Sequence, residues 1–521
     1  MTRLRIWSDR PHLPLVQAIE QAPWRNAAGV DVVDDAPDVT LVVLDTDESP
    51  ADWSFANHRD VDLTGPVLFV GPGVAEDGQT SPAHDIRLRA GAIGEQHDVV
   101  IHDQLLAIPT HYASDTPLIT ANIGYRDLPV AASAPGQLGT VLATGILPTT
   151  WEKPAFLRLI HRLLHHVSHR NIAPAVRVGL LGYGAIGHEH AAAINAVPGL
   201  ELAMVCDTQS ARLDAAEQFT PGVRVTVDPE HLVTADDVDL IVVSTPPSTH
   251  ADWALRVLNA GKHVVLEKPM ALTSAECDAV IDRAQQLNLL AVVYQNRRYD
   301  PDFLAIAQLI ASDDLGDVFH LESFVGTHQH PCNYWHSDRD VSGGALFDWG
   351  SHVVDQILQL MPGDIEYVTA MNHKRRWHDV TNADHARMTL HYSDGREATF
   401  VYSDLAAALK PRWYLTGTKG GIIGDWRQES VLSRSAIGTL SEDVLAAADS
   451  PPVIRLFAED GRVSVVPGVS PSPFAFHAEL AAYLQHGFPM QVNADQSRRV
   501  VAMLEAAEAS AVKDGRPVSP A

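Results

Sequence analysis

Hydrophobic and polar positions follow three successive patterns along the chain, and each pattern predicts a separate domain. Residues 1–170 carry short apolar runs between polar and helical segments. Residues 171–295 alternate apolar strands with helices, and residues 296–521 carry longer strands with alternating apolar and polar positions. These changes of period predict an N-terminal α/β domain, a second α/β domain and an α+β domain.

The first pattern is typical of a layered α/β unit. A helix is predicted from Pro154 to Ser168, because its apolar residues recur at helical spacing. The stretch from Pro72 to Asp98 is rich in Gly, Pro, Asp, Gln and Ser, which predicts an exposed loop or an eroded segment. Residues 171–175 break the helical pattern and are expected to be a linker. Short strands are predicted at 4–7, 39–44, 67–70 and 139–144.

After Val176 the alternation of strands and helices becomes regular. Strands joined by helices run parallel, so this part predicts a doubly wound parallel sheet. Beyond Tyr294 the strands lengthen, and Asp-Gly turns at 394–395 and 460–461 favour a large open antiparallel sheet. A helical run is predicted from Phe476 to Lys513.

Composition narrows the classes of function. The 521 residues include 38 Lys and Arg against 65 Asp and Glu, and the resulting charge of −27 argues against nucleic-acid or membrane-surface binding. Three cysteines, Cys206, Cys277 and Cys332, are too few for a disulfide framework or a four-thiolate zinc site. The N-terminus lacks an apolar signal region, and no run approaches the ~18 apolar residues of a membrane span. The protein is therefore predicted to be cytoplasmic.

A glycine motif lies directly between the first strand and the first helix of the second domain. It comprises Gly182, Tyr183, Gly184, Ala185, Ile186 and Gly187. Gly182 permits a tight turn, Gly184 lets the backbone approach a pyrophosphate, and Gly187 allows the helix to pack closely on the strand. The N-terminus of the following helix then faces the anion. This context predicts a dinucleotide site.

Asp207 closes the next strand, where its carboxylate can accept hydrogen bonds from the ribose hydroxyls of NAD. The same carboxylate would repel a 2′-phosphate, which favours NAD as the cofactor. Arg212 lies near enough in sequence to bind a 2′-phosphate, so NADP stays possible.

Residues 244–273 follow the glycine motif and Asp207, and they include the sequence Glu267-Lys268-Pro269. With these motifs the chain resembles, from Val176 to its C-terminus, the Gfo/Idh/MocA family of NAD(P)-dependent sugar and cyclitol oxidoreductases, of which Glu267-Lys268-Pro269 is the most specific element. Residues 294–303 and 342–356 are similar to the substrate-side motifs of the family. The resemblance implies a secondary alcohol as substrate, with hydride transfer to the nicotinamide.

The resemblance also implies roles for individual residues. Lys268 polarises the reacting oxygen, His352 takes the proton and Asp348 orients the pair; the i, i+4 spacing of Asp348 and His352 puts both on one helix face. Pro269 is expected to follow a cis peptide bond. The remaining implied cofactor contacts are Ser244, Thr245, Pro246, Pro247, His250, Glu267, Lys268, Gln295 and Asn296. Substrate contacts are expected from Tyr294, Arg298 and Trp335 as well as the catalytic residues, although Arg298 could equally form a structural ion pair.

Two other functions share this fold. In a redox-neutral enzyme the hydride would return to the sugar after epimerisation, elimination or glycoside cleavage. A cofactor-sensing regulator would bind NAD and sugar without turnover, but such a protein needs no proton acceptor. The partners expected are a carbohydrate or cyclitol and further copies of the chain in a dimer or tetramer, with no nucleic acid and no membrane.

Two histidine-rich sets suggest a metal site at first sight. They are His328, His330, Cys332 and His336, and His161, His165 and His169. Neither carries a specific metal motif, and hydride transfer to a nicotinamide needs no metal, so no metal is predicted.

The N-terminal domain has its own resemblance. Residues 116–166 are similar to trehalose-utilisation (ThuA-like) domains, which have a glutamine-amidotransferase-like fold. Amidotransfer needs a cysteine nucleophile, and no cysteine precedes Cys206. The domain is therefore expected to be a non-catalytic scaffold, dimerisation surface or lid, with a carbohydrate-handling site as the alternative.

Overall fold

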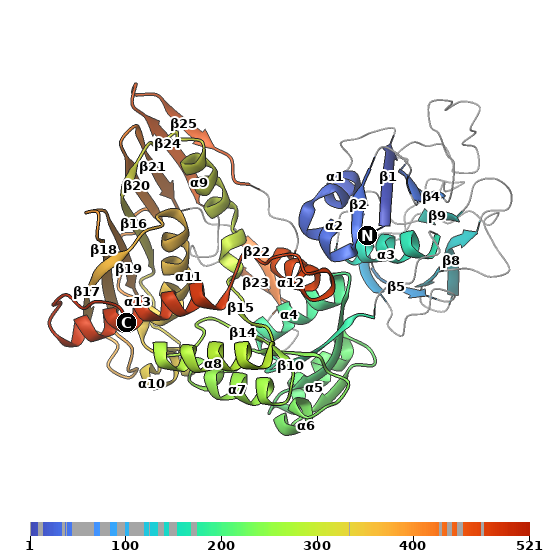
Figure 1. The fold of residues 1–521 in the computed structure, drawn as a ribbon, viewed down its shortest axis with the longest axis horizontal. Helices are drawn as coiled ribbons and strands as arrows, with labels where there is room; N and C mark the ends of the chain where they lie inside the picture. The colour runs from blue at the N-terminus through green and yellow to red at the C-terminus, as the bar shows by residue number, and fades with distance from the viewer. Residues whose placement is uncertain are drawn as a thin grey trace.

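A computed structural model gives the fold of the chain (Figure 1). The described residues are 2–8, 14–33, 37, 39–43, 67–72, 84–90, 99–103, 119–123, 126–133, 140–144, 154–167, 174–332, 334–426, 430–434, 440–444, 452–469 and 474–521. The N-terminal strands lie on one side and the large C-terminal sheet on the other, with the second sheet between and below them. Among the described helices, none is long and apolar enough to cross a membrane.

The N-terminal part is a nine-stranded sheet in its described residues, in the order β2-β1-β3-β4-β9-β8-β7-β5-β6. Pairing is parallel from β2 to β9 and antiparallel from β9 to β6. The strands are β1 Thr2–Ser8, β2 Val30–Val32, β3 Val39–Val43, β4 Val67–Pro72, β5 His84–Ala90, β6 Val99–Asp103, β7 Ile119–Ile123, β8 Arg126–Ser133 and β9 Thr140–Thr144. The helices are α1 Pro14–Glu20, α2 Ala22–Ala28 and α3 Pro154–Val167.

Four strands and the helix α3 were predicted from the apolar pattern and are confirmed. The loop expected at 72–98 is wrong at its centre, where β5 pairs with β6 and β7. Its alternating sequence, HDIRLRA, has the period of a strand, which the surrounding glycines and prolines masked. The remainder of that stretch, 73–83 and 91–98, lies outside the described residues. The ThuA-like resemblance stays a prediction.

The second sheet is the predicted doubly wound one, parallel throughout, in the order β12-β11-β10-β13-β14-β15. Its central strands are buried on both faces, as their near-continuous Val, Ile and Leu runs require. The strands are β10 Val176–Leu181, β11 Leu200–Cys206, β12 Arg224–Thr226, β13 Leu240–Val243, β14 His263–Leu266 and β15 Ala291–Val293. Its helices are α4 Ala185–Ala196, α5 Ser210–Phe219, α6 Pro229–Val233, η3 Pro247–Thr249, α7 His250–Asn259 and α8 Ser274–Leu287.

The third part contains an eight-stranded sheet in the order β17-β18-β19-β16-β20-β21-β24-β25, and a separate hairpin β22-β23. The strands are β16 Val318–Gly326, β17 Ile365–His373, β18 His385–Tyr392, β19 Glu397–Ser403, β20 Trp413–Gly417, β21 Gly420–Asp425, β22 Ser430–Arg434, β23 Leu440–Val444, β24 Val453–Ala458 and β25 Val463–Val466. The two Asp-Gly turns join β18 to β19 and β24 to β25, as predicted. The expectation of a purely antiparallel sheet is corrected at one pair, because β16 and β19 run parallel.

The helices of this part include α11, which carries the predicted Asp348 and His352. The helices are η4 Asn296–Tyr299, α9 Pro301–Ala311, η5 Trp335–Ser337, α10 Arg339–Ser342, α11 Ala345–Leu360, α12 Ala475–His486 and α13 Ala494–Val512. The single C-terminal helical run that was predicted is two helices. Gly487, with a φ of +74°, ends α12, and a capping box between Asn493 and Gln496 starts α13.

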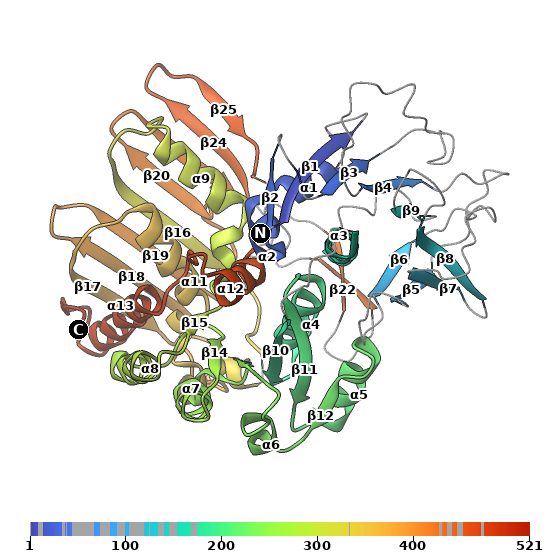
Figure 2. The ribbon, with the colours of Figure 1, turned by 45° about the vertical axis from the view of Figure 1, so that its right-hand side comes forward.

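Helix α12 lies against the second sheet although it comes from the end of the chain. Its Phe476, Leu480 and Ala481 share a buried core with Val178 and Ile194. The same helix packs against α2 of the N-terminal part (Figure 2). Helix α12 therefore connects the N-terminal part to the second sheet.

Candidate active site

Three glycines shape the turn between β10 and α4. Gly182 has a φ of +98°, and a Cβ there would lie 2.6 Å from the Ser244 carbonyl oxygen. A Cβ at Gly187 would come within 2.5 Å of the Gly182 carbonyl oxygen, so only glycine lets α4 pack this closely. At Gly184, the N-cap of α4, a Cβ would meet open space.

This turn fits the pyrophosphate of a dinucleotide. The first N–H groups of a helix have no intrahelical partner, and here they belong to residues that include Ala185 and Ile186. The space in front of Gly184 leaves room for phosphate oxygens beside them. NAD(P) would be held here by backbone N–H groups.

Asp207 lies beside the turn, immediately after β11, as predicted. One carboxyl oxygen accepts the N–H of Tyr183 at 2.8 Å, and the other accepts the N–H of Gln209 at 2.9 Å. Arg212 forms an ion pair with the same carboxylate, with 3.3 Å between its Nη1 and Oδ2 of Asp207. The two backbone contacts and Arg212 together fix the orientation of the carboxylate.

The segment after β13 forms the other wall of the turn. The Ser244 hydroxyl donates to the Gly182 carbonyl at 2.7 Å, and the Thr245 and Thr249 hydroxyls are 2.7 Å apart. Pro246 and Pro247 lead into η3. His250 is fully buried, with its two ring nitrogens 2.8 Å from the carbonyl oxygens of Thr245 and Pro269. His250 therefore ties two loops together and has no face open to a cofactor.

The predicted catalytic residues meet at the end of β14. The Lys268–Pro269 bond is cis. The Lys268 ammonium lies 2.9 Å from Oδ1 of Asp348 and 3.2 Å from its carbonyl oxygen. His352 lies one turn further along α11 and is 6% exposed. Among the described residues, no group hydrogen-bonds its Nδ1.

The charges of this cluster act on one another. Burial would raise the pKa of Asp348, but the Lys268 ammonium and then His336 outweigh it, and the pKa is lowered. The pKa of His352 lies well below 6.5, because the ring is buried and because Lys268, Arg297 and Arg412 are positive. At neutral pH the site therefore holds an ionised carboxylate and a neutral imidazole.

Arg297 borders the site, although the sequence singled out its neighbour. Its guanidinium stacks 4.5 Å over the Trp349 ring and pairs with Asp300 at 3.3 Å. Arg298 is 3% exposed and makes a bidentate ion pair with Asp355 at 2.7 and 2.6 Å. The geometry of Arg298 therefore favours the structural alternative, an ion pair that ties η4 to α11.

The remaining predicted contacts, Tyr294, Gln295 and Asn296, follow β15. The Tyr294 ring packs on the buried ring of His190, with centroids 4.4 Å apart. Gln295 is buried and donates to the Ser351 carbonyl at 3.4 Å. Asn296 opens η4.

The aromatic segment before α10 reaches Asp348. Trp335 stacks on His336 with ring centroids 3.6 Å apart, and His336 Nδ1 lies 3.9 Å from Asp348 Oδ1. Flat aromatic faces suit the C–H surfaces of sugar rings. The pKa of His336 is lowered by burial, against the opposing charge of Asp348.

The histidine-rich sets have other partners. His330 pairs with Asp379 at 2.8 Å and His328 lies 3.3 Å from Arg376, while the Cys332 thiol is 3.3 Å from the Ser337 hydroxyl. His161 and His165 both contact the Ala28 carbonyl, and His169 lies outside the described residues. No group of three or more ligand side chains gathers among the described residues.

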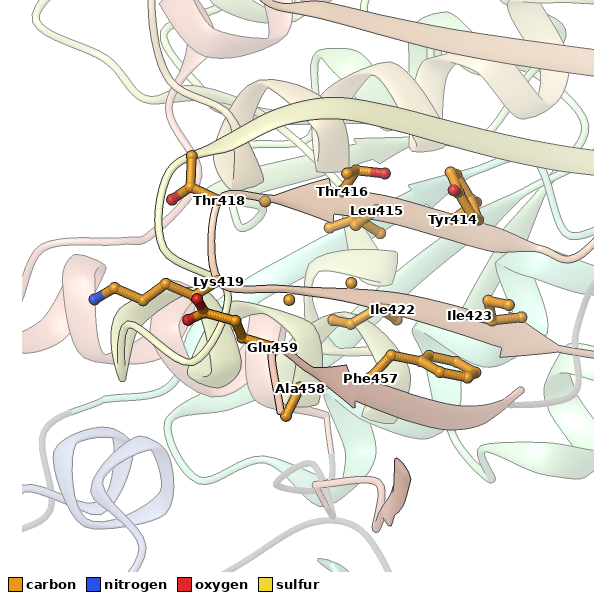
Figure 3. Close-up of a pocket in the computed structure, with 13 residues that line it drawn as sticks. Tyr414, Leu415, Thr416, Thr418, Lys419, Ile422, Ile423, Phe457, Ala458 and Glu459 are labelled. Atoms are coloured by element: carbon orange, nitrogen blue, oxygen red, sulfur yellow. The ribbon is translucent and has the colours of Figure 1, made fainter. Parts of the chain in front are cut away.

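A pocket elsewhere on the molecule contains none of the predicted site residues. It lies on the sheet formed by β20, β21 and β24, lined by residues that include Tyr414, Thr416, Ile422, Phe457 and Glu459 (Figure 3).

Sequence reasoning singled out Glu267 but missed the two histidines, His190 and His477, that lie behind it. Glu267 contacts His190, which contacts His477, and the last two are separated by 287 residues. No local pattern connects them. Arg412, whose charge reaches His352, was missed for the same reason.

Two family profiles match the chain. One is described as an oxidoreductase family with an NAD-binding Rossmann fold and matches residues 176–295; the other is the GFO/IDH/MocA C-terminal domain, at 303–423. A scyllo-inositol 2-dehydrogenase (NADP(+)) of Bacillus subtilis is 27% identical over 347 residues, which is 65% of this chain and 94% of that protein. An uncharacterized oxidoreductase of Escherichia coli is 32% identical over 48% of this chain and 70% of its own.

Two further relatives bear on cofactor and chemistry. A glycosyl hydrolase family 109 protein of Shewanella baltica is 30% identical over 43% of this chain and 55% of its own. The solved structure of GenD2 from gentamicin A biosynthesis, in complex with NAD, is 25% identical with a TM-score of 0.54, covering 67% of this chain and 97% of its own.

Proposed function

The chain belongs to the Gfo/Idh/MocA family of NAD(P)-binding oxidoreductases, and on that premise we propose that its substrate is a secondary hydroxyl of a sugar, sugar derivative or cyclitol. The observation that carries the proposal is the contact of Lys268 with Asp348, with His352 one turn along the same helix. An ammonium, a carboxylate and a neutral imidazole together supply what alcohol oxidation needs from a protein.

Each of these residues has one task. When bound, NAD(P) would supply the hydride acceptor for the carbinol carbon, and the residues of this chain would do the rest. Lys268 donates a hydrogen bond to the reacting oxygen and stabilises its developing negative charge. His352 takes the hydroxyl proton, for which its low pKa keeps the ring neutral and ready. Asp348 holds the ammonium in place at 2.9 Å.

We propose NAD as the preferred cofactor. The fixed carboxylate of Asp207 would repel a 2′-phosphate, and its pairing with Arg212 offsets that repulsion only in part. The Bacillus relative uses NADP, and GenD2 was solved with NAD, so both occur among similar proteins. Initial rates with NAD and NADP at equal concentration decide the preference.

The test is substrate-dependent formation of reduced nicotinamide across a panel of inositols, aldoses, glycosides and sugar acids. Lys268→Met is expected to lower kcat by about 10²-fold or more, because the reacting oxygen loses its cationic partner. Its affinity for NAD, measured by calorimetry, is expected to stay within about threefold. Lys513→Met, at an exposed lysine, is the matched control. Full activity in the Lys268 variant would remove this residue from the mechanism.

A redox-neutral reaction is the second candidate, because one relative is named as a glycosyl hydrolase. In that case the hydride returns to the sugar, so a changed or cleaved sugar is expected without accumulation of NADH. Product analysis by chromatography, run beside the absorbance assay, separates the two reactions. Binding of NAD and sugar without any product would instead favour a sensor.

We also propose that the chain forms a homo-oligomer in the cytoplasm. Support comes from apolar side chains that the large sheet leaves exposed, among them Phe319, Tyr414, Val463 and Val465. Light scattering on the purified protein tests the oligomeric state, and a monomer at micromolar concentration would contradict it.

A further inference from the structure

Behind the catalytic lysine lies a buried chain of three polar side chains from three distant elements. His477 on α12 has Nε2 2.9 Å from Nδ1 of His190 on α4. His190 Nε2 lies 3.0 Å from Oε1 of Glu267, directly after β14. The three residues are 1%, 0% and 7% exposed. Burying polar groups this deeply costs free energy unless they are hydrogen-bonded, and these three side chains bond to one another.

The hydrogen bonds between His477, His190 and Glu267 all run in one direction. A carboxylate only accepts, so His190 Nε2 carries the proton that meets Glu267. With that proton on Nε2, Nδ1 of His190 is left to accept from Nε2–H of His477. This leaves Nδ1 of His477 without a proton, which agrees with its lack of a hydrogen-bond partner among the described residues.

This row of hydrogen bonds ends at the backbone N–H of Lys268. Oε2 of Glu267 accepts the N–H of Lys268 at 3.1 Å, while Oε1 accepts from His190. With both oxygens engaged, the carboxyl group has one orientation. The Tyr294 ring packs on both imidazoles, at 4.4 and 5.2 Å between centroids, and closes the layer against water.

We propose that His190 and His477 are positioning residues that act through Glu267, orienting it so that it holds the backbone of Lys268 for proton and hydride transfer. This proposal rests on the proposed function of Lys268. It assigns a task to α12, because that helix brings its histidine to α4 from the far end of the chain. It also links the turn that binds the dinucleotide, from which α4 starts, to the residue that contacts the reacting oxygen.

Paired variants at position 190 test the proposal in the full-length protein. His190→Gln keeps a donor that can reach Glu267, whereas His190→Leu removes it. We expect kcat to fall 10- to 100-fold in His190→Leu, with the Kd for NAD within about threefold, since misplacement by about 1 Å can cost 10²-fold. His190→Gln is expected to recover kcat to within about fivefold. Equal kcat losses in both variants would overturn the proposal.

His477→Phe removes the terminal donor while it keeps an aromatic ring of similar size. We expect an intermediate loss of kcat, about 3- to 10-fold, because His190 keeps Glu267 as a partner but loses its own orienting contact. His231→Phe, at an exposed histidine of α6, is the control. An unchanged kcat in His477→Phe would remove α12 from the proposal. If His190→Leu does not fold, His190→Gln and His477→Phe still decide it.

A spectroscopic readout separates this proposal from the proposed function. In nitrogen-15-labelled protein, the imidazole shifts are expected to show both His190 and His477 protonated at Nε2. The Nζ resonance of Lys268, assigned with Lys268→Met, is expected to move in His190→Leu and to stay in His190→Gln. Other tautomers, or an unmoved Nζ resonance in His190→Leu, would overturn the positioning role. Wild-type protein that turns over no polyol would instead contradict the proposed function.

Discussion

The His352 ring, on α11, lies within range of the Lys268 charge and is only 6% exposed. Burial alone disfavours an imidazolium there, and the positive charges of Lys268, Arg297 and Arg412 add to the effect. The unfolded chain, in contrast, binds a proton at His352 near pH 6.5. The same shift therefore bears on both catalysis and stability.

The pH dependence of oxidation follows from this shift. A base is active when neutral, so we expect the acid limb of the kcat/KM profile to lie below pH 6.5. Stability contributed by His352 is complete above pH 6.5 and is lost as pH falls further, because the unfolded state then binds more protons. Initial rates and melting temperatures from pH 5 to 8 check both. His352→Asn is expected to lose less stability on acidification than the wild type, and an acid limb above pH 6.5 would contradict the assignment.

At the level of single residues, the sequence predicted those that lie in contiguous motifs. Lys268, Asp348 and His352 meet because the glycine-started helix α11 points two of them at the end of β14. The His190–His477 contact could not be predicted, since only the packing of α12 brings these residues together. The roles of Arg297 and Arg298 could not be told apart from the sequence either, because adjacent arginines have the same chemistry. Only the structure shows that Arg298 is the one with the buried partner Asp355.

At the level of elements, the turn from β10 to α4 offers a matched pair of substitutions. A methyl group at Gly187 would collide with the Gly182 carbonyl, whereas one at Gly184 would point into open space. We expect Gly187→Ala to lower the free energy of unfolding by about 1–3 kcal/mol. Gly184→Ala is expected to change it by less than about 1 kcal/mol and yet to weaken NAD binding, since the methyl group occupies the space for the pyrophosphate.

Chemical denaturation and calorimetric titration of the two glycine variants check this prediction. Loss of NAD affinity in Gly184→Ala with unchanged stability would show that the space belongs to the cofactor. An equal loss of stability in both variants would indicate that the whole turn is tightly packed, contrary to the geometry.

Helices and strands were predicted well where a single apolar period runs through the segment. They were predicted poorly where the pairing of distant segments decides the structure. The strands of the second sheet follow from their apolar runs. The parallel pairing of β16 with β19 does not, because α11, β17 and β18 intervene before the chain returns to the same sheet. The break between α12 and α13 had a local signal in Gly487, which the apolar pattern on either side concealed.

At the level of the whole molecule, Arg158 joins the N-terminal part to the dinucleotide-binding sheet. Its guanidinium, on α3, donates to the carbonyl oxygens of Ile194, Val197 and Leu200 at 2.8, 2.9 and 2.8 Å. These carbonyls lie at the end of α4 and the start of β11, where helical hydrogen bonds run out. Burial lowers the pKa of Arg158 to about 10, so the group stays charged at neutral pH.

Arg158→Ala is expected to destabilise this junction by about 2–4 kcal/mol, because three carbonyl groups lose a charged donor. Calorimetry should then show an early transition of the N-terminal part, separate from that of the other two. Arg462→Ala, at an 84% exposed arginine paired with Asp460, is expected to change stability by less than about 1 kcal/mol. A single unshifted transition in Arg158→Ala would mean that the junction does not depend on this residue.

The position of α12 also has a consequence for biosynthesis. The core that covers α4 is completed by residues from Phe476 onward, whereas the last strand of that sheet ends at Val293. At a translation rate of about 5–20 residues per second, the interval of roughly 180 residues corresponds to about 10–35 s. Throughout that time the nascent sheet exposes an apolar face on the ribosome, so chaperones that bind such faces should hold this chain until α12 emerges.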